Sequence, residues 1–160
     1  MFGLTKTAPY HDEILGALKR SGKHWKGSLA LEPHGAVELI LSGDRSRPDS
    51  ASLALARELP EQYADLRPEI QISLFEHYVP YREAVTQGAF PRHVSPFPEI
   101  PNAEAIWPHV TVRFVRIEPL LTAGQMVDTV EVAYKAEWDE EHTLGARMQE
   151  WRLIELCGSV

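Results

Sequence analysis

Residues 109–138, "HVTVRFVRIEPLLTAGQMVDTVEVAYKAEW", decide the predicted fold, because apolar and polar side chains alternate at both ends of this stretch. The apolar members of the alternation are Val110, Val112 and Phe114 in the first segment and Val130, Val132 and Tyr134 in the second. A period of two residues is typical of a β-strand that buries one face. Further short strands are predicted at 143–148 and 151–156, and the two residues between them match a tight hairpin. We therefore predict a four-stranded antiparallel meander at the carboxyl-terminal end.

Residues 47–85 have a helical period instead, with apolar side chains about every 3.6 residues. Asp49 or Ser50 is a suitable amino-terminal cap for a first helix, because its side-chain oxygen can accept a free backbone N–H. Pro60 predicts an end or a kink of that helix, since proline removes a helical hydrogen bond. Asp65 is a suitable cap for a second helix. The sequence therefore predicts two central helices.

Two further elements are predicted before the central helices. Residues 9–20 place Ile14 and Leu18 on one face of a short helix. The apolar segments 24–32 and 35–44 are separated only by a proline and a histidine, which is typical of a β-hairpin.

The predicted fold class is α+β. A largely antiparallel sheet, made of the amino-terminal hairpin and the carboxyl-terminal four-stranded meander, has the two central helices packed on one face. At 160 residues the chain is long enough to bury a hydrophobic core, so we predict a single domain covering residues 1–160.

Composition argues against several classes of protein. The formal net charge is −7, and residues 131–160 contribute −4 of it, from three Lys or Arg against seven Asp or Glu. Such an acidic chain is a poor ligand for nucleic acid, whose phosphates need cations. No apolar run reaches the ~20 residues that span a bilayer, and the single cysteine, Cys157, excludes an intramolecular disulfide framework. We expect a soluble, cytoplasmic protein that binds neither nucleic acid nor membranes.

The stretch most suggestive of chemistry is "EWDEEHTLG", residues 137–145, which holds four carboxylates and an imidazole. In a regular strand, Asp139 and Glu141 point to one side, and Glu140 and His142 point to the other. Metal sites and acid–base pairs both need side chains that converge. The histidines of the chain also show no H-x-x-x-H or H-E-x-x-H spacing. We therefore expect no metal, no cofactor and no catalytic residue here, and interpret the stretch as an acidic turn that faces water or a partner.

A proline-rich connection over residues 86–108 is the other candidate binding segment. Its aromatic and cationic side chains are Phe90, Arg92, His93, Phe97 and Trp107. Aromatic residues and arginine are favoured at protein-recognition hot spots. The alternative is that the two aromatic residues nearest the meander simply cover the core, as aromatic residues under long loops commonly do.

Three segments of the chain, 24–29, 98–117 and 130–159, carry a resemblance to a known kind of protein. They resemble small bacterial domains of unknown function that share an aromatic–Asp–Glu–Glu–His–x–Leu–Gly run entering a final hairpin. Trp138 is the aromatic residue of that run here, and Thr143 stands where we expect a glycine. The resemblance implies accessory or immunity proteins encoded near secreted toxins, and it brings no catalytic residues.

The sequence thus predicts a non-enzymatic protein-binding module. Its most concrete form is a bacterial immunity-type protein that neutralises a basic toxin through an acidic face, with residues 137–142 and the loop 90–107 as contacts and Trp138 anchored in the core. One alternative is a small metal-dependent or acid/base hydrolase that uses the acidic and histidine side chains of residues 139–142. A second alternative is a structural domain that oligomerises through an edge strand.

Overall fold

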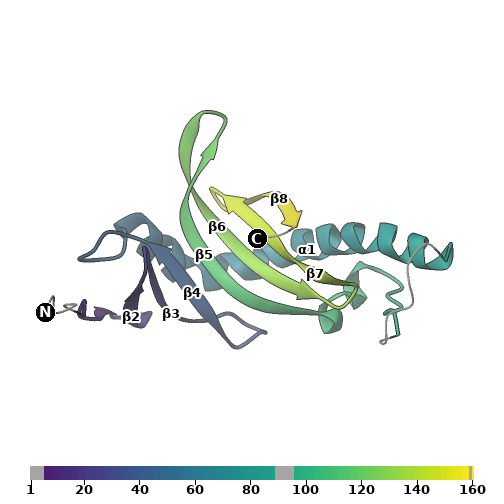
Figure 1. Cartoon of the computed structure of the whole chain (residues 1–160), viewed down its shortest axis with the longest axis horizontal. Coiled ribbons are helices and arrows are strands. Elements are labelled where there is room, and N and C mark those ends of the chain that lie inside the picture. The colour runs from purple at the N-terminus through teal and green to yellow at the C-terminus, as the bar shows by residue number, and fades with distance from the viewer. Residues whose placement is uncertain (1–5, 89–95, 159) are drawn as a thin grey trace, which may run out of the picture.

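In the computed structural model, which describes residues 6–88, 96–158 and 160, one long helix lies against one face of a twisted eight-stranded sheet (Figure 1). The elements are β1 (Tyr10–Asp12), β2 (Gly16–Ser21), β3 (His24–Ala30), β4 (Ala36–Ser42), α1 (Ser50–Thr86), the 3₁₀ turns η1 (Ala103–Ala105) and η2 (Trp107–His109), β5 (Val110–Thr122), β6 (Gln125–Ala136), β7 (Asp139–Gln149) and β8 (Arg152–Gly158). The strands lie in the sheet in chain order. All neighbours are antiparallel except β4 and β5, which are parallel because α1 carries the chain back between them.

The predicted fold class is wrong in its helices and in its sheet. Two central helices were expected on a sheet made of one hairpin and one four-stranded meander, whereas the described residues form one α-helix and a sheet of eight strands. The predicted hairpin corresponds to β3 and β4, and the predicted meander to β5–β8. The sheet is larger because β1 and β2 extend it at one edge and because the β4–β5 pair joins its two halves.

A single helix forms because its buried stripe continues past Pro60 and Pro68, and the partly buried Tyr81 still packs against the core after Pro80. Pro60, Pro68 and Pro80 lie inside α1, and all three are exposed. The buried side chains of the helix are Ser52, Leu53, Ala56, Leu59, Tyr63, Leu66, Ile70, Leu74 and Tyr78. A proline in a helix interior costs about 3 kcal/mol, whereas burying one large apolar side chain is worth roughly 1.5–3 kcal/mol. Each proline leaves one backbone carbonyl of the preceding turn without its helical N–H, and on the exposed side of the helix that carbonyl can accept a hydrogen bond from water. The free energy gained by packing the buried stripe therefore exceeds the cost of the three prolines.

The amino-terminal segment forms two strands in place of the predicted short helix. The carboxylate of Asp12 accepts hydrogen bonds from the backbone N–H groups of Ile14 and Leu15, each at 2.9 Å, and so turns the chain between β1 and β2. Gly16 completes the turn at φ +75°, in the left-handed region that favours glycine. Asp12 is itself buried and paired with Arg57 of α1. A contact with a distant helix therefore fixes this local turn.

The hydrophobic core fills the space between α1 and the inner face of the sheet. Alternate residues of the meander reach this core, as the period-two pattern predicts. A bulge between Val112 and Phe114 shifts the alternation in β5, so Val115 and Ile117 are fully buried while Phe114 is only half-buried.

The hairpin of β5 and β6 extends beyond its neighbouring strands and projects from the body of the molecule (Figure 1). Strand β4 pairs with β5 only as far as Ile117, and β7 pairs with β6 only from Val130 onward. Residues 118–129 between these points are paired only with one another. We refer to residues 118–129 as the arm.

Candidate functional site

The predicted acidic turn joins β6 to β7 through an extended bulge. Ala136 pairs with Asp139, but the next pair is Lys135 with Thr143, so residues 140–142 have no partner on β6. The segment is an acidic turn between two strands, as predicted, but the regular pleat used to orient its side chains is wrong. The bulge abolishes the alternation that was expected to send the side chains of residues 139–142 to opposite faces.

Asp139 holds this bulge in shape. Its side chain is 4% exposed, and its Oδ1 accepts hydrogen bonds from the backbone N–H of His142 at 3.2 Å and from His142 Nδ1 at 2.9 Å. Its Oδ2 accepts a hydrogen bond from the hydroxyl of Tyr81 on α1 at 2.8 Å. Burial raises the pKa of Asp139, but the hydrogen bonds from Tyr81 and His142 outweigh it and hold this pKa below its ordinary value. The structure thus brings together Asp139 and His142, which the sequence placed apart.

Trp138 anchors the turn in the core, as predicted from the sequence. Its side chain is buried, and its indole Nε1 donates a hydrogen bond to Nδ1 of His77 on α1 at 3.1 Å. Because that nitrogen accepts, the neutral His77 ring carries its proton on Nε2. Burial also lowers the pKa of His77, which favours this neutral form. Helix α1 therefore supports the turn through both His77 and Tyr81.

The remaining carboxylates of the turn face solvent. Glu140 and Glu141 are exposed on the bulge, and Glu137 is exposed beside it. Glu137 Oε2 lies 2.8 Å from Nδ1 of His109 in η2, and Lys135 Nζ donates a hydrogen bond to the backbone oxygen of Glu140 at 3.3 Å. We call residues 137–142 the acidic turn; its exposed carboxylates are those of Glu137, Glu140 and Glu141. Its backbone is fixed from behind while its carboxylates remain accessible.

The second predicted segment packs on the protein's own core wherever it is described. Phe90, Arg92 and His93 lie outside the described residues. Phe97 stacks on Tyr78 of α1, with their ring centroids 5.7 Å apart. The indole N–H of Trp107 donates to Gln71 Oε1 at 2.7 Å, and the guanidinium of Arg67 lies 4.3 Å from the centroid of the Trp107 ring. Packing accounts for both described aromatic residues.

A chain of hydroxyl groups crosses the core and was not predicted from the sequence. The hydroxyl groups of Tyr134 and Tyr63 lie 2.7 Å apart, and that of Tyr63 lies 2.8 Å from Nε2 of His34. Burial raises the pKa of Tyr63 to about 12 and that of Tyr134 well above its ordinary value. It lowers the pKa of His34, as does the nearby Arg67. Both tyrosines stand at positions where the periodicity of their elements predicts a buried apolar side chain. Because a buried hydroxyl group usually has a hydrogen-bond partner, this placement is the one sequence signal for the contact.

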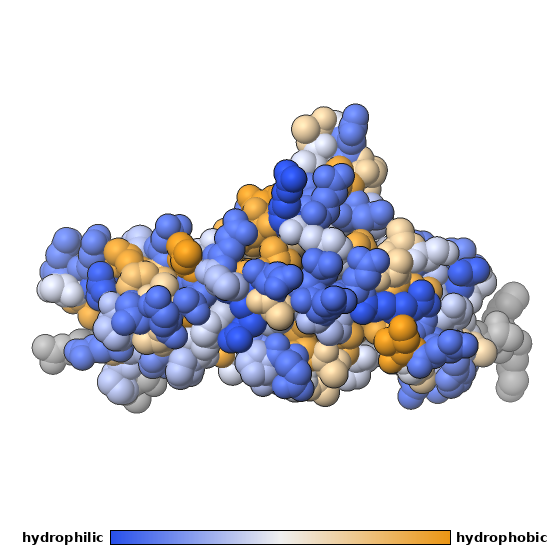
Figure 2. All heavy atoms as spheres, turned by 180° about the vertical axis from the view of Figure 1, so that it is seen from behind, coloured by the Kyte–Doolittle hydropathy of each residue, from blue (hydrophilic) through white to orange (hydrophobic). Residues whose placement is uncertain are grey.

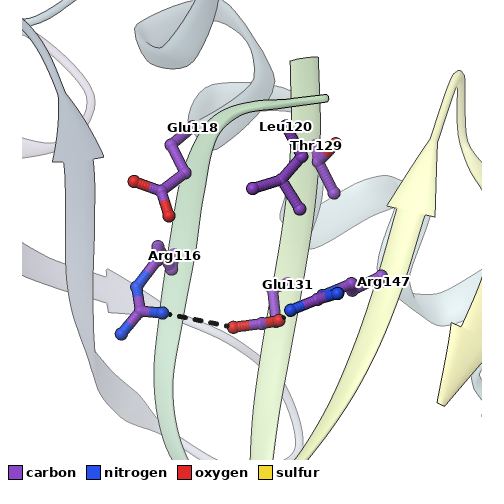
Figure 3. Close-up of a pocket in the computed structure, with 6 residues that line it drawn as sticks. All are labelled: Arg116, Glu118, Leu120, Thr129, Glu131 and Arg147. Carbon is purple, nitrogen blue, oxygen red and sulfur yellow. Dashed lines mark hydrogen bonds and ion pairs between the residues drawn. The ribbon is translucent and has the colours of Figure 1, made fainter. Parts of the chain in front are cut away.

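The outer face of the sheet carries a compact charge cluster (Figure 3). Glu131 is 4% exposed, although it lies on the face away from α1. Its carboxylate accepts a hydrogen bond from Arg147 Nε at 2.7 Å and lies 3.6 Å from Arg116, while Arg147 also pairs with Glu155 at 3.0 Å. The adjoining cavity is about 20 Å³, room for a single water molecule. Its charges compensate one another, so we assign the cluster to the stability of the sheet.

The fold and these sites define a class of protein: a mostly antiparallel eight-stranded sheet, crossed by one helix that braces an acidic turn. The chain belongs to the family described as Domain of unknown function (DUF6985), whose family model matches residues 14–159. This match confirms the resemblance to a domain of unknown function, while the association with immunity proteins stays a prediction. No curated protein and no solved structure matches the chain.

A metal site and a membrane-spanning helix each place requirements on the described residues. Within residues 6–88 and 96–158, no group of three or more His, Cys, Asp or Glu side chains is arranged to hold a metal ion. Among the same residues, no helix is both long and apolar enough to cross a bilayer.

Proposed function

We propose that this protein is a non-enzymatic binding module whose acidic turn contacts a basic protein partner. Its most concrete form is a bacterial, cytoplasmic immunity-type protein that neutralises a basic toxin. The observation that carries the proposal is the bulge at residues 140–142, which presents Glu140 and Glu141 to solvent on a backbone that Asp139 fixes from within.

A fixed backbone favours binding because less conformational freedom is lost when the partner arrives. In the acidic turn, the buried Asp139 and Trp138 hold the main chain, and α1 holds both of them. The roles of the carboxylates therefore divide. Asp139 positions the turn, whereas the exposed carboxylates of Glu137, Glu140 and Glu141 are the contact groups.

The charge of the chain favours a cationic partner. Exposed carboxylates on a molecule with a net charge of −7 accelerate encounter with a basic surface, and they oppose binding to another acidic one. Rim charges of this kind act mainly on the association rate and on its salt dependence. The partner surface that fits is one rich in Lys or Arg.

The test compares two triple variants with the same change in charge. Glu137→Gln/Glu140→Gln/Glu141→Gln neutralises the acidic turn, and Glu61→Gln/Asp65→Asn/Glu69→Gln neutralises three exposed carboxylates of α1. Proteins retained from lysates of the source cells are identified, and the affinity of each purified partner is measured between 50 and 300 mM salt, a range chosen because screening grows across it.

We expect a partner whose affinity falls about tenfold in the acidic-turn variant, because three exposed charge contacts at about 0.5 kcal/mol each sum to roughly 1.5 kcal/mol. The α1 variant should retain full affinity. Equal affinity of both variants for every retained protein, or affinity that does not respond to salt, refutes the proposal.

A second candidate function rests on the Asp139–His142 contact. Asp139 accepts from His142 Nδ1 at 2.9 Å, which leaves Nε2 of a neutral His142 as a base on a side chain that is 42% exposed. This arrangement favours acid–base hydrolysis over the metal-dependent version. Hydrolysis of activated carboxylic and phosphate esters by the wild type, lost in His142→Gln and retained in His109→Gln, supports this function. Equal rates in all three proteins exclude it.

A further inference from the structure

The arm leaves an apolar surface uncovered at the end of the sheet opposite the acidic turn. Leu121 and Met126 face each other across its two strands and are 71% and 65% exposed. They lie on the same face as Ile117 and Val130, which are buried beneath α1. The face that forms the core therefore continues along the arm past the cover of the helix, first with the Pro119–Asp128 pair and then with the apolar Leu121–Met126 pair.

The exposed apolar residues of the arm are adjacent to each other, unlike isolated apolar residues on a protein surface. Single exposed apolar residues are common, but Leu121 and Met126 are direct cross-strand neighbours on one face of the arm, so together they form a continuous apolar pair. Figure 2, which views the molecule from behind, shows apolar surface on the arm and just below it, between hydrophilic side chains. Methionine and leucine at the tip of a projecting hairpin suit insertion into a cleft.

The arm is held in a defined shape. Ala123 and Gly124 form its two-residue turn, with φ values of 49° and 80° that match the turn type favoured in tight hairpins. Gln149 of β7 donates hydrogen bonds to the hydroxyl groups of Thr129, at the base of the arm, and of Thr122, beside its turn, each at 2.9 Å. The body of the protein therefore braces both strands of the arm, which lowers the ordering cost of docking.

Strand addition along the β5 edge is disfavoured by Pro119. A two-residue turn closes on a hydrogen-bonded pair, here Thr122 with Gln125, and hydrogen-bonded pairs then alternate with pairs whose backbone groups point outward. Pro119, opposite Asp128, falls in an outward-pointing pair and has no N–H to offer a neighbouring strand. Along the β5 edge, the arm therefore binds more readily through its side chains than by adding a strand.

The charges of the arm indicate which kind of partner it can bind. Residues 118–129 contain Glu118 and Asp128 but no Lys or Arg. Glu118 lies 3.3 Å from His24, whereas Asp128 is exposed beside the apolar pair. Anionic lipid surfaces and nucleic acids both require cations and are therefore disfavoured. A projecting apolar element with an exposed carboxylate fits a concave apolar site with a cationic edge.

We infer that the arm docks into an apolar cleft of a protein partner whose rim places Lys or Arg opposite Asp128. This surface is separate from the acidic turn. The ten residue-to-residue steps of β6 from Met126 to Ala136 span about 33 Å, so the two surfaces occupy opposite ends of the same strand. The docking of the arm does not depend on the proposed function of the acidic turn.

The experiment uses the full chain as its own probe, with photoreactive benzoylphenylalanine in place of Met126, irradiated in the source cells. The control probe carries the same group in place of Ile72, an exposed apolar residue of α1. We expect a protein crosslink specific to the arm probe. Mapping of the crosslinked peptide should place it in a cleft lined by apolar residues and edged by Lys or Arg.

Variants of the arm probe make the result decisive. The crosslink yield should fall at least tenfold with Leu121→Ser and several-fold with Asp128→Asn, and it should persist when Glu137, Glu140 and Glu141 are all changed to Gln. Persistence in that triple variant separates this inference from the proposed function. A crosslink to a second copy of this chain, to lipid, to an acidic surface, or none above the Ile72 control overturns the inference.

Discussion

Replacement of Asp139 by alanine tests the assignment of this residue as the clamp of the acidic turn. The substitution removes the acceptor for the hydroxyl of Tyr81 and for the backbone N–H and ring nitrogen of His142. A hydrogen bond to a charged group contributes about 1.5–3 kcal/mol net. Counted as one contact with Tyr81 and one with His142, both at the lower end of that range, these give a loss of about 3 kcal/mol in the free energy of unfolding. At this chain length that loss corresponds to a decrease in Tm of about 9 °C.

The conservative variant Asp139→Asn separates charge from shape. An amide fills the same space and can still accept one hydrogen bond, but it lacks the charge that strengthens these contacts. We expect a loss of about 1.5 kcal/mol for Asp139→Asn. The neighbouring Glu140→Ala is the control, because Glu140 is exposed and its substitution should stay within about 0.5 kcal/mol of the wild type.

The assay is urea unfolding followed by tryptophan fluorescence, repeated from pH 7 to pH 3. The folded-state pKa of Asp139 lies below the ordinary value of 3.8, because hydrogen bonds from Tyr81 and His142 outweigh the opposing effect of burial. Its contribution is therefore present above pH 3.8 and is lost as the pH falls through the folded pKa. The difference between wild type and Asp139→Asn should shrink in that acidic range. A loss below 1 kcal/mol for Asp139→Ala at pH 7, or a loss equal to that of Glu140→Ala, refutes the clamp.

Three further predictions concern the buried polar groups. Tyr63→Phe should cost about 2 kcal/mol because it leaves the buried hydroxyl of Tyr134 without an acceptor, whereas Tyr134→Phe should cost less than about 1 kcal/mol because Tyr63 keeps His34. The pKa of His34 is lowered by burial from 6.5, so the folded protein binds fewer protons than the unfolded chain; stability should decline as the pH falls from 6.5 toward the folded pKa, and His34→Gln should make that decline shallower, with the buried His77 accounting for the part that remains. Gly145→Ala places a methyl group 2.8 Å from Val160 Cγ1 and 2.9 Å from the Glu131 carboxylate, so urea unfolding should show a loss of about 1–3 kcal/mol.

These predictions have distinct failure outcomes. Equal losses for the two tyrosine variants mean that the hydroxyl of Tyr134 has an acceptor other than Tyr63. An unchanged pH profile in His34→Gln means that His34 is not the group that titrates in this range. A Gly145→Ala protein as stable as the wild type means that the outer-face charge cluster can shift to admit a methyl group.

The strands of the meander could be predicted from the sequence because each buries one face in the core, which imposes a period of two on its own residues. In β6 the predicted apolar residues Val130, Val132 and Tyr134 are all buried, although the intervening Thr129, Glu131 and Ala133 are buried on the other face as well. The helices could not be predicted as well, because local preference and long-range packing disagree. Pro60 marks a break by its own chemistry, yet Leu59 and Tyr63 on either side of it are fully buried. Only the sheet beneath them decides that the helix continues.

The candidate site shows the same division. The position of the acidic turn and the burial of Trp138 follow from sequence pattern alone. The pairing of Asp139 with His142 does not, because it depends on a bulge that Tyr81 supports from 58 residues away. A regular pleat is the default expectation for a strand, and no residue between 137 and 145 indicates that a bulge interrupts it.

The parallel pairing of β4 with β5 has a consequence for the order of folding. Its register joins only four residue pairs, from Glu38 with Phe114 to Leu41 with Ile117, across the whole length of the crossover helix. The antiparallel hairpins on either side close short loops and should form within microseconds, whereas this junction must wait for a long loop to close. The two halves of the sheet thus fold first as local units. The pairing of β4 with β5, with α1 packed across it, then sets the rate at which the complete sheet forms.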